Sequence, residues 1–556
     1  MPHGLSTSEI APYINENTPF GPVATEQIAD RLLWQSLFDR ENRVYSHLVQ
    51  RDPAFVVGRR GAGKTAFLDT LNTDQTTLNV EINTSTAVAE MEDLLRAMSD
   101  LGVTLFADHV AEIWGAALWH GLLAALVQHP PDAMDQADER FDVVKVYLDD
   151  LTDDASRTVS FDEAMSTFCV EFLLQAEKRR TVARHPTQFA AGDMKLATVI
   201  RSVTELLNES AVGPVLLLDS IEDFQDVLDY HTRTIEGLFM QVGRSTQPTA
   251  PYRIRFSFPA ELWHVLRAMS RNPLKDFGRF VVLQWSAREI VKIAAHRYML
   301  YLEHFHKPYL DRSPSVARLN TDSERESLQL LRSALPATVN GEESIAYVLR
   351  HTQLLPRHLL RLLNAIWARG NNGAGRVKVS EEAVIVGVQD VEEQIVTEIC
   401  KAYELVHPVA DEVCRAVIKN LPRRFTDSEL HRAYNRVGKG AVKRANRTLA
   451  ERRLAERSHR VGVLDSASDM DYFDFKSMLL EIGCIGRQID QTERYDIAEF
   501  EYTIPHRLAV GDNDLMCVHP LFSGVYQSIP DEGDTQRAVY PYGTDPTSDP
   551  RLRNMR

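Results

Sequence analysis

The sequence is poor in cysteine, and none of its five cysteines stands in a C-x-x-C pair; they are Cys169, Cys400, Cys414, Cys484 and Cys517. Scattered thiols argue against a disulfide framework or a zinc site and favour a reducing compartment, so we expect a cytoplasmic protein. The first residues show no basic stretch followed by an apolar one, so no secretory signal is expected. Apolar runs stay short of about 18 residues, so we expect no membrane span.

A basic charge balance is also missing, because the formal net charge is −16. An acidic chain is not a bulk nucleic-acid binder, so contact with nucleic acid would need a local basic patch. The sequence has no internal repeat, no long low-complexity segment and no nuclease, protease or deaminase motif. It has 44% hydrophobic and 25% charged residues, which is typical of a globular chain. Its 556 residues are enough for about two to four domains.

One short motif, VGRRGAGKT at 57–65, carries specific chemistry. It matches G-x-x-x-x-G-K-[ST] with Gly58, Gly63, Lys64 and Thr65, between an apolar run and a helical pattern. The glycines let backbone N–H groups converge on phosphate oxygens, while Lys64 would neutralise the β- and γ-phosphates. The Thr65 hydroxyl would hold Mg²⁺ at the start of the helix. The motif therefore predicts ATP and Mg²⁺ as cofactors.

The other loop residues are predicted from their places in the motif. Gly61 and Ala66 join the four motif residues as the predicted nucleotide-binding residues in and just after the loop. Arg59 and Arg60 are more doubtful ligands, because arginines in loops are more often solvated or paired with a carboxylate than bound to phosphate.

The acidic half of such a site follows a second apolar run, VLLLD at 215–219. Asp219 would bind the Mg²⁺ shell. The next residue is Ser220 and not an acid, so the candidate for polarising the attacking water is Glu222, with Asp223 as a weaker choice. Lys64, Asp219 and Glu222 are the predicted catalytic residues. Acids at this position also fit the first turn of a helix, where they favour the dipole.

Apolar runs at 54–57, 78–82, 215–218, 252–258 and 280–283 alternate with helical patterns. This alternation predicts an α/β fold with a parallel sheet and helices on both faces. Residues 85–209 are almost wholly helical in pattern and predict a large helical insertion. Ser257, near the end of the fourth run, is expected to reach the γ-phosphate, although a polar strand end is the simpler alternative.

These pieces resemble the AAA+ and STAND side of the P-loop NTPases, near the origin-recognition and STAND regulatory ATPases. The resemblance rests on the loop, on LLLDSIED at 216–223, and on the strand that carries Ser257. It continues through VVLQWSAREIVKIAAHRY at 281–298, which is similar to the start of a helical lid, and QLLPRHLLRLLNAI at 353–366. It implies a P-loop NTPase core with a helical lid, and it spans about 20–370.

The resemblance also implies roles for lid residues. A proline of the lid signature packs on the adenine and a nearby arginine senses phosphate, and these would be Pro356 and Arg357. Leu354 stands where the STAND form usually has glycine, which departs from that pattern. A surface arginine that begins a helix is the alternative for Arg357.

A further likeness concerns bacterial P-loop ATPases with a W-x₃-L pattern in a long helical insertion. Trp114 and Leu118 fit this pattern, as does the opening at Phe20, Gly21, Ala24 and Glu26. Core packing of Trp114 and Trp119 is the interpretation we adopt. Such ATPases assemble as homo-oligomers with ATP bound and use an arginine from a neighbour; Arg271 and Arg279 are candidates by position alone.

The pattern predicts five regions. They are an N-terminal helical segment at 1–50, the core at 51–284, the lid at 285–370, a winged-helix-like α+β domain at 376–527 and a loosely ordered tail at 528–556. GNNGAG at 370–375 is the predicted linker between lid and C-terminal domain.

The C-terminal region contains the local basic patch. Residues 423–460 hold twelve Lys and Arg against four Asp and Glu. Thr426 would cap one helix, a turn is expected at 438–440, and a second, basic helix would follow. This predicts a helix-turn-helix, with later strands within 499–510. Duplex DNA is the partner this patch predicts; a solvated helix face or an acidic protein partner is the alternative.

Three functional hypotheses follow. The first is a DNA-linked ATPase or ATP-dependent switch, which the resemblance places in replication-like, mobile-element or antiviral defence systems. The second is a STAND-like signalling module that acts through an effector protein. The third is a nucleotide-binding scaffold that does not hydrolyse ATP, supported by Ser220 after Asp219.

Overall fold

The computed structural model describes most of the chain. The described residues are 6–24, 37, 44, 50–70, 78–103, 105–152, 159–179, 188–219, 229–263, 278–312, 323–370, 377–456, 470–492, 494–504, 508–530 and 537–545.

The core is a five-stranded sheet in the order β2-β5-β6-β1-β7, and every neighbouring pair is parallel. The strands are β1 (Phe55–Gly58), β2 (Asn79–Ile82), β5 (Val215–Leu218), β6 (Arg253–Pro259) and β7 (Phe280–Leu283). β1 and β5 are buried at every position, because helices cover both faces of a parallel sheet. The predicted α/β fold is confirmed. β6 lies between β1, which leads into the VGRRGAGKT loop, and β5, which ends just before Asp219.

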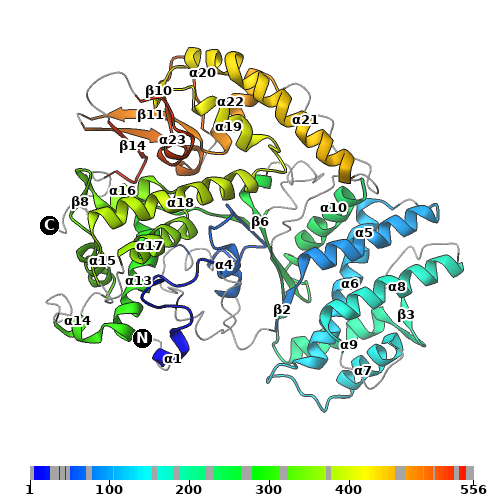
Figure 1. Cartoon of the computed structure of the whole chain (residues 1–556). Coiled ribbons are helices and arrows are strands. Elements are labelled where there is room, and N and C mark those ends of the chain that lie inside the picture. Colours follow the sequence, from blue (N-terminus) through cyan, green and yellow to red (C-terminus); the bar gives the residue numbers. More distant parts are fainter. Residues whose placement is uncertain are drawn as a thin grey trace.

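The helical insertion forms its own layer beside the sheet (Figure 1). Its helices are α5 (Thr84–Asp100), α6 (Ala107–Gln128), α7 (Glu139–Thr152), α8 (Phe161–Arg179) and α9 (Leu196–Glu209), with α10 (Asp229–Ser245) packed on α6. Trp114 is fully buried and its indole Nε1 donates to the Thr234 carbonyl at 3.0 Å, so the core-packing interpretation of Trp114 is confirmed.

The sequence pattern predicts an almost wholly helical insertion, but the structure also contains a short hairpin there. β3 (Ala190–Ala191) and β4 (Met194–Lys195) form a small antiparallel hairpin, and α9 begins only at Leu196. Gly192 has φ +53° in the turn between them, a conformation that favours glycine. Two-residue strands carry too little periodicity to be recognised in the sequence.

Among the described residues, one helix is long and apolar enough to cross a membrane. This is α6, and 83% of its most apolar window is buried within the protein. Burial of this kind is typical of a core helix, since α6 packs between α8 and α10.

The lid and the C-terminal region share one hydrophobic core, which also takes in Phe20 from the N-terminal segment. The lid contains α13 (Ala287–Phe305), α14 (Lys307–Arg312), α15 (Ser323–Ala334), α16 (Ser344–Arg350) and α17 (Pro356–Gly370), with the short pair β8 (Thr338–Val339) and β9 (Glu342–Glu343). α18 (Glu381–Ala402) packs along α17. The predicted linker at 370–375 thus joins two packed helices. Gly370 is the last residue of α17, and residues 371–375 of the linker lie outside the described residues.

The C-terminal domain combines helices with a second sheet in the order β10-β13-β11-β12-β14. Its helices are α19 (Ala410–Ile418), α20 (Asp427–Ala433), α21 (Lys439–Glu456), α22 (Tyr472–Glu481) and α23 (Pro520–Tyr526). Its strands are β10 (Arg424–Phe425), β11 (Ile485–Gln491), β12 (Tyr495–Glu499), β13 (Met516–Val518) and β14 (Ala538–Pro541). α19 to α22 and the antiparallel strands β10, β13 and β11 give the predicted winged-helix-like arrangement.

Two local predictions about this domain are wrong. Within 499–510, only Glu499 of the described residues lies in a strand, and Glu501–Thr503 is a short 3₁₀ helix. The region 528–556, expected as a loose tail, contributes β14, which pairs in parallel with β12. A parallel pairing between distant segments leaves no local signature in the sequence.

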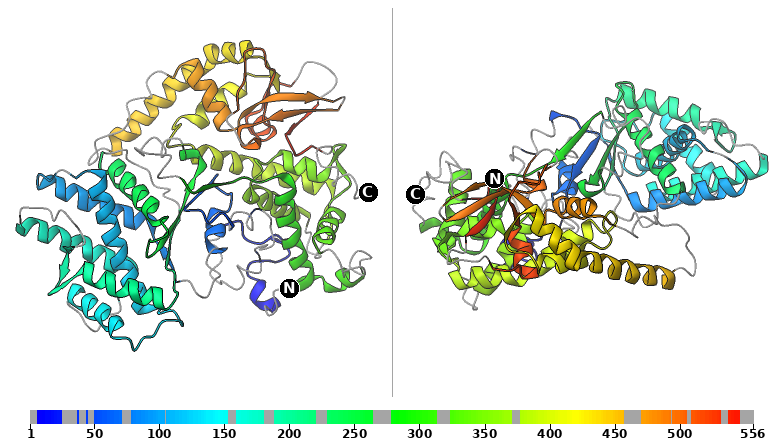
Figure 2. Two further views of the ribbon diagram at one scale, coloured as in Figure 1. Left: turned by 180° about the vertical axis from the view of Figure 1, so that it is seen from behind. Right: turned by 90° about the horizontal axis from the view of Figure 1, so that it is seen from above.

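The predicted turn at 438–440 is also wrong. α20 continues through a π-helical turn, Tyr434–Gly438, directly into α21. A Cβ on Gly438 would lie 2.8 Å from the Tyr434 ring, so this glycine permits close packing and not a turn. The basic segment is therefore one long interrupted helix, which projects away from the body of the domain (Figure 2).

Candidate nucleotide site

The VGRRGAGKT loop joins β1 to α4 (Lys64–Thr70) with two glycines in the left-handed region. Gly61 has φ +87° and Gly63 has φ +85°, which side chains rarely allow. A Cβ on Gly58 would lie 3.1 Å from Lys64 Cγ, so the loop packs closely on the lysine stem. The side chain of Ala66 is buried in the core, which leaves its backbone as the part that could face a ligand.

Asp219 brings the loop and the sheet together. The Thr65 hydroxyl donates to Asp219 Oδ2, and the Ser257 hydroxyl donates to Oδ1. The three side chains come from α4, from the residue after β5 and from β6, and Ser257 is fully buried. Three of the residues predicted from separate parts of the sequence therefore meet at one carboxylate.

The donor set fits a magnesium ion held by few protein ligands. Thr65 and Asp219 supply a hydroxyl and a carboxylate oxygen that already touch, and Mg²⁺ prefers oxygen ligands and keeps several waters. The described residues contain no group of three or more His, Cys, Asp or Glu side chains that could hold a metal ion by themselves. A nucleotide phosphate would have to complete such a site.

The contacts of the two loop arginines do not favour a simple role in binding phosphate. Arg59 Nη2 donates to Gln353 Oε1 at 2.6 Å, and its Nε lies 3.9 Å from the carboxylate of Glu261. Its guanidinium also lies over the Tyr502 ring of the C-terminal domain, 5.4 Å from the centroid. The Arg60 backbone N–H donates to Glu261 Oε1 at 3.0 Å. Arg59 is thus paired with a carboxylate, as loop arginines often are.

The sequence did not identify Glu261, Gln353 or Tyr502. Glu261 is 4% exposed, and Gln353 Nε2 donates to the Ile482 carbonyl at 2.9 Å. The loop is therefore linked to the C-terminal domain both through Gln353 and through Tyr502. Such contacts between distant segments have no motif that a single sequence could reveal.

The lid helix α17 begins at Pro356 and places Arg357 against the loop. A Cβ on Gly61 would lie 3.1 Å from Arg357 Cβ and 3.3 Å from its Cδ, so the arginine stem crosses this glycine. Arg357 Nη1 donates to Glu398 Oε1 at 2.9 Å, and Arg361 Nη1 donates to Glu398 Oε2 at 2.5 Å. Arg357 is thus packed at the loop and only 23% exposed, unlike a free surface arginine.

The electrostatics of this corner keep Glu398 charged and its neighbour His358 neutral. Burial raises the pKa of Glu398. The hydrogen bond from Arg357 and the charge of Arg361 lower this pKa by more, so the net shift is downward. Burial lowers the pKa of His358 to about 3. The neutral ring can then accept the Gln353 N–H at Nδ1, at 3.4 Å.

Leu354, the departure from the STAND pattern, has φ +52°. This is the left-handed conformation for which glycine is favoured, so the geometry explains why glycine would be usual at this place. Leu354 is 6% exposed and its backbone N–H donates to Thr352 Oγ1 at 3.2 Å. Burial of the side chain offsets a backbone strain of about 1 kcal/mol.

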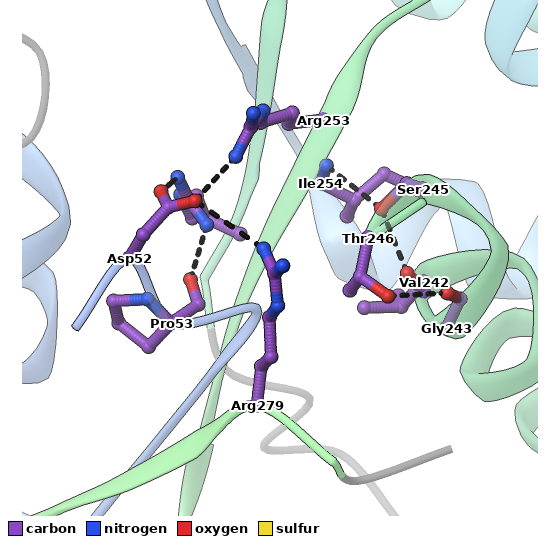
Figure 3. Close-up of polar contacts among 10 residues, drawn as sticks. Asp52, Pro53, Val242, Gly243, Ser245, Thr246, Arg253, Ile254 and Arg279 are labelled. Carbon is purple, nitrogen blue, oxygen red and sulfur yellow. Dashed lines mark hydrogen bonds and ion pairs between the residues drawn. The ribbon is translucent and has the colours of Figure 1, made fainter. Parts of the chain in front are cut away.

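The remaining predicted residues are divided between two groups. Ser220, Glu222, Asp223 and Arg271 lie outside the described residues. Arg279 lies just before β7, at the opposite end of the strands from the loop, where it is 3.4 Å from Asp52. Asp52 also pairs with Arg255. Figure 3 shows Asp52 between Arg253, with which it forms a further pair, and Arg279. Within its own chain, Arg279 is therefore remote from the candidate site.

The residues of the basic patch also differ in their surroundings: some are paired, some are exposed and some lie outside the described residues. Arg424 is 3.6 Å from Asp496 inside the sheet region, whereas an exposed row runs along the interrupted helix. The exposed basic residues are Arg432, Arg436, Lys439, Lys443, Arg444 and Arg447. Arg457 and Arg460 lie outside the described residues.

Comparison with known proteins adds little to this geometry. No protein-family model and no curated protein sequence matches the chain. The chain is similar to the solved structure of Cdc6p from Pyrobaculum aerophilum, with 12% identity, 93% of this chain and 99% of that chain covered, and a TM-score of 0.27. It is also similar to the ORC2 protein of Aeropyrum pernix, solved as ADPNP–ADP complexes, with 10% identity, 87% and 92% covered, and a TM-score of 0.34.

Scores this low carry no functional argument. The fold assignment rests on the molecule itself: the chain has an α/β P-loop fold with a helical insertion, a helical lid and a C-terminal winged-helix-like domain.

Proposed function

We propose that the chain binds ATP with Mg²⁺ at the VGRRGAGKT loop and hydrolyses it slowly, as an AAA+-like switch that also contacts DNA. The observation that carries this proposal is the meeting of the Thr65 and Ser257 hydroxyls on Asp219, beside the glycine loop that bears Lys64. A carboxylate and a hydroxyl at the end of a phosphate-binding loop are the protein ligands that a Mg²⁺–nucleotide complex needs.

Each residue has a role in this proposal. Lys64 neutralises phosphate charge, and the loop N–H groups around Gly61 and Gly63 donate to phosphate oxygens. Thr65 and Asp219 would hold Mg²⁺, which would supply positive charge that offsets the charge of the phosphates. Pro356 packs on the adenine and Arg357 responds to the terminal phosphate. Glu222 remains the proposed residue for polarising water.

The DNA part of the proposal rests on the interrupted helix. Five of its exposed basic residues recur three or four positions apart and so lie along one side of the helix; they are Arg432, Arg436, Lys439, Lys443 and Arg447. Tyr434, Gly438 and Val442 are buried against the domain. A row of guanidinium and ammonium groups fits a phosphate backbone. Because α20, the π-helical turn and α21 follow one another with no loop between them, the row is longer than a helix-turn-helix would give.

The test of nucleotide binding compares the unmodified chain with Lys64→Ala. ATP affinity should fall by at least about tenfold, because the loop loses the lysine that neutralises phosphate charge. Lys195→Ala, at an exposed lysine of the insertion hairpin, is the matched control and should bind ATP normally. Equal ATP affinity in all three proteins would refute the nucleotide site.

The test of the switch measures ATP turnover with and without duplex DNA at two salt concentrations. The proposal expects turnover to rise with DNA, and DNA affinity to fall steeply with salt. Arg436→Glu should weaken DNA binding and lower the salt slope by about one. Binding of ATP without turnover, even with DNA present, would favour the non-hydrolysing scaffold that acts through a protein partner. Analytical ultracentrifugation with and without ATP tests the expected homo-oligomer.

A further inference from the structure

We propose that Glu398, in the first helix of the C-terminal domain, positions Arg357 for contact with the bound nucleotide. This inference rests on the proposed function, because Arg357 has a nucleotide to contact only if the loop binds one. It adds a residue that lies outside the loop, the sheet and the lid. It also makes the C-terminal domain part of the nucleotide site.

The first step is the way Glu398 is shared. Its two carboxylate oxygens accept from two different arginines, Arg357 at 2.9 Å and Arg361 at 2.5 Å. The two arginines lie one helical turn apart on α17, so the carboxylate bridges them from α18. Each arginine donates one hydrogen bond to Glu398, so one negative charge is shared by two positive ones.

The second step is the place where Arg357 is held. Its stem crosses Gly61, whose missing side chain leaves room for it. Glu398 takes one N–H of the guanidinium at Nη1, and a guanidinium has five N–H donors. Among the described residues, Glu398 is the hydrogen-bond partner that the structure shows for Arg357, and the stem of this arginine lies beside the glycine loop. A partly exposed arginine with an excess of positive charge next to a phosphate-binding loop is suited to an anionic phosphate.

The third step is the cost of losing the carboxylate. An arginine side chain has several rotatable bonds, and fixing it reduces the entropy that is lost when it binds a ligand. Glu398 is 16% exposed, so its ion pairs are shielded from solvent more than a surface pair would be. Without Glu398, Arg357 would sample other rotamers and would repel Arg361. A small misplacement of such a group weakens its action strongly.

The experiment is a double-mutant cycle on nucleotide affinity in the full chain. Glu398→Gln should lower ATP affinity by about tenfold, which corresponds to about 1.4 kcal/mol, and should lower ADP affinity much less. In an Arg357→Ala background, the same substitution should cause no further loss of ATP affinity. Glu393→Gln is the matched control, because Glu393 lies on the same helix, is 74% exposed and is 3.9 Å from Arg415; it should bind ATP normally.

The cycle separates positioning from a general structural effect. A structural role would lower ATP and ADP affinity equally and would add to Arg357→Ala; either result overturns the inference. Higher ATP affinity in Glu398→Gln would also overturn it, because the carboxylate would then compete with the nucleotide. If Glu398→Gln fails to fold, Glu398→Asp keeps the charge and should show an intermediate loss of ATP affinity. If the unmodified chain binds no ATP, the proposed function itself fails; if it binds ATP and the cycle is additive, only this inference fails.

Discussion

Two groups of arginines lie at opposite ends of the same parallel strands, and each group surrounds one carboxylate. At the loop end, Glu398 is 16% exposed and bridges Arg357 and Arg361 from a neighbouring helix. At the other end, Asp52 is 42% exposed and faces Arg253, Arg255 and Arg279. The chemistry of the ion pairs is the same, but the surroundings differ.

The two groups differ in burial and in their distance from the glycine loop, and these two differences determine which group should affect ligand binding and which should affect stability only. The Asp52 group joins three strand starts to one another, and its exposed pairs are screened by solvent. The Glu398 group joins the lid to the C-terminal domain directly above the glycine loop, where solvent screens it less. We therefore expect substitutions in the Glu398 group to change ligand affinity, and substitutions in the Asp52 group to have only modest effects on stability.

The largest expected effect is on ATP binding. Arg357→Ala should lower ATP affinity by about 30-fold, or about 2 kcal/mol, because the site loses a charged donor next to the phosphates. Arg279→Ala should leave the affinity of dilute protein unchanged, because Arg279 lies at the far end of the strands. Titration with a fluorescent ATP analogue measures both, and equal losses would break the comparison.

The next effect concerns pH, because the loop-end group packs around the buried His358. The folded pKa of His358 is lowered to about 3, below the usual 6.5, so the unfolded chain takes up the proton first. Stability is therefore lost as pH falls from about 6.5 towards 3. His358→Asn should remove about 2 kcal/mol of this loss between pH 7 and pH 5, as measured by urea unfolding at each pH. Parallel pH curves for the two proteins would contradict this assignment.

A smaller effect is expected at Asp52. Asp52→Asn removes the carboxylate that pairs with Arg255, whose side chain is 9% exposed, and leaves three guanidiniums near one another. The free energy of unfolding should fall by about 1 kcal/mol, since Asp52 itself is partly exposed. Chemical denaturation measures this, and ATP affinity should not change. A loss of ATP affinity would show that the two ends of the sheet are coupled.

The smallest effect sharpens the same contrast. Arg253 is 47% exposed and shares Asp52 with two other arginines. Arg253→Ala should therefore change the free energy of unfolding by no more than about 0.5 kcal/mol. A larger change would mean that the exposed pair contributes more than solvent screening allows.

Much of the fold could be predicted because its signals are local. The apolar runs at 54–57 and 215–218 form buried strands. Thr65 at the start of α4, Asp219 after β5 and Ser257 in β6 meet at the carboxyl edge of the parallel sheet, where the motif places them. Gly61 and Gly63 take the positive φ that the motif demands. The roles of these residues in binding a nucleotide stay predictions.

The errors arose where local signals mislead. Gly438 and Gly440 indicate a turn by composition, but packing against Tyr434 and Val417 keeps the chain helical through a π-helical turn. β14 was missed because its partner, β12, is about 40 residues away in the chain, so pairing depends on the assembled sheet. The link from Arg59 to Tyr502 joins residues that are even further apart.

The sequence by itself determined the phosphate loop, the acidic strand end and the alternation of strands and helices. These depend on backbone conformations and periodicities that neighbouring residues impose. Only the tertiary structure decided that α18 supplies Glu398 to Arg357 of the lid and that the lid and the C-terminal domain share a core. It also decided that Arg59 faces the C-terminal domain. Contacts of this kind depend on how separate helices pack, because the burial of their apolar faces fixes which distant charges become neighbours.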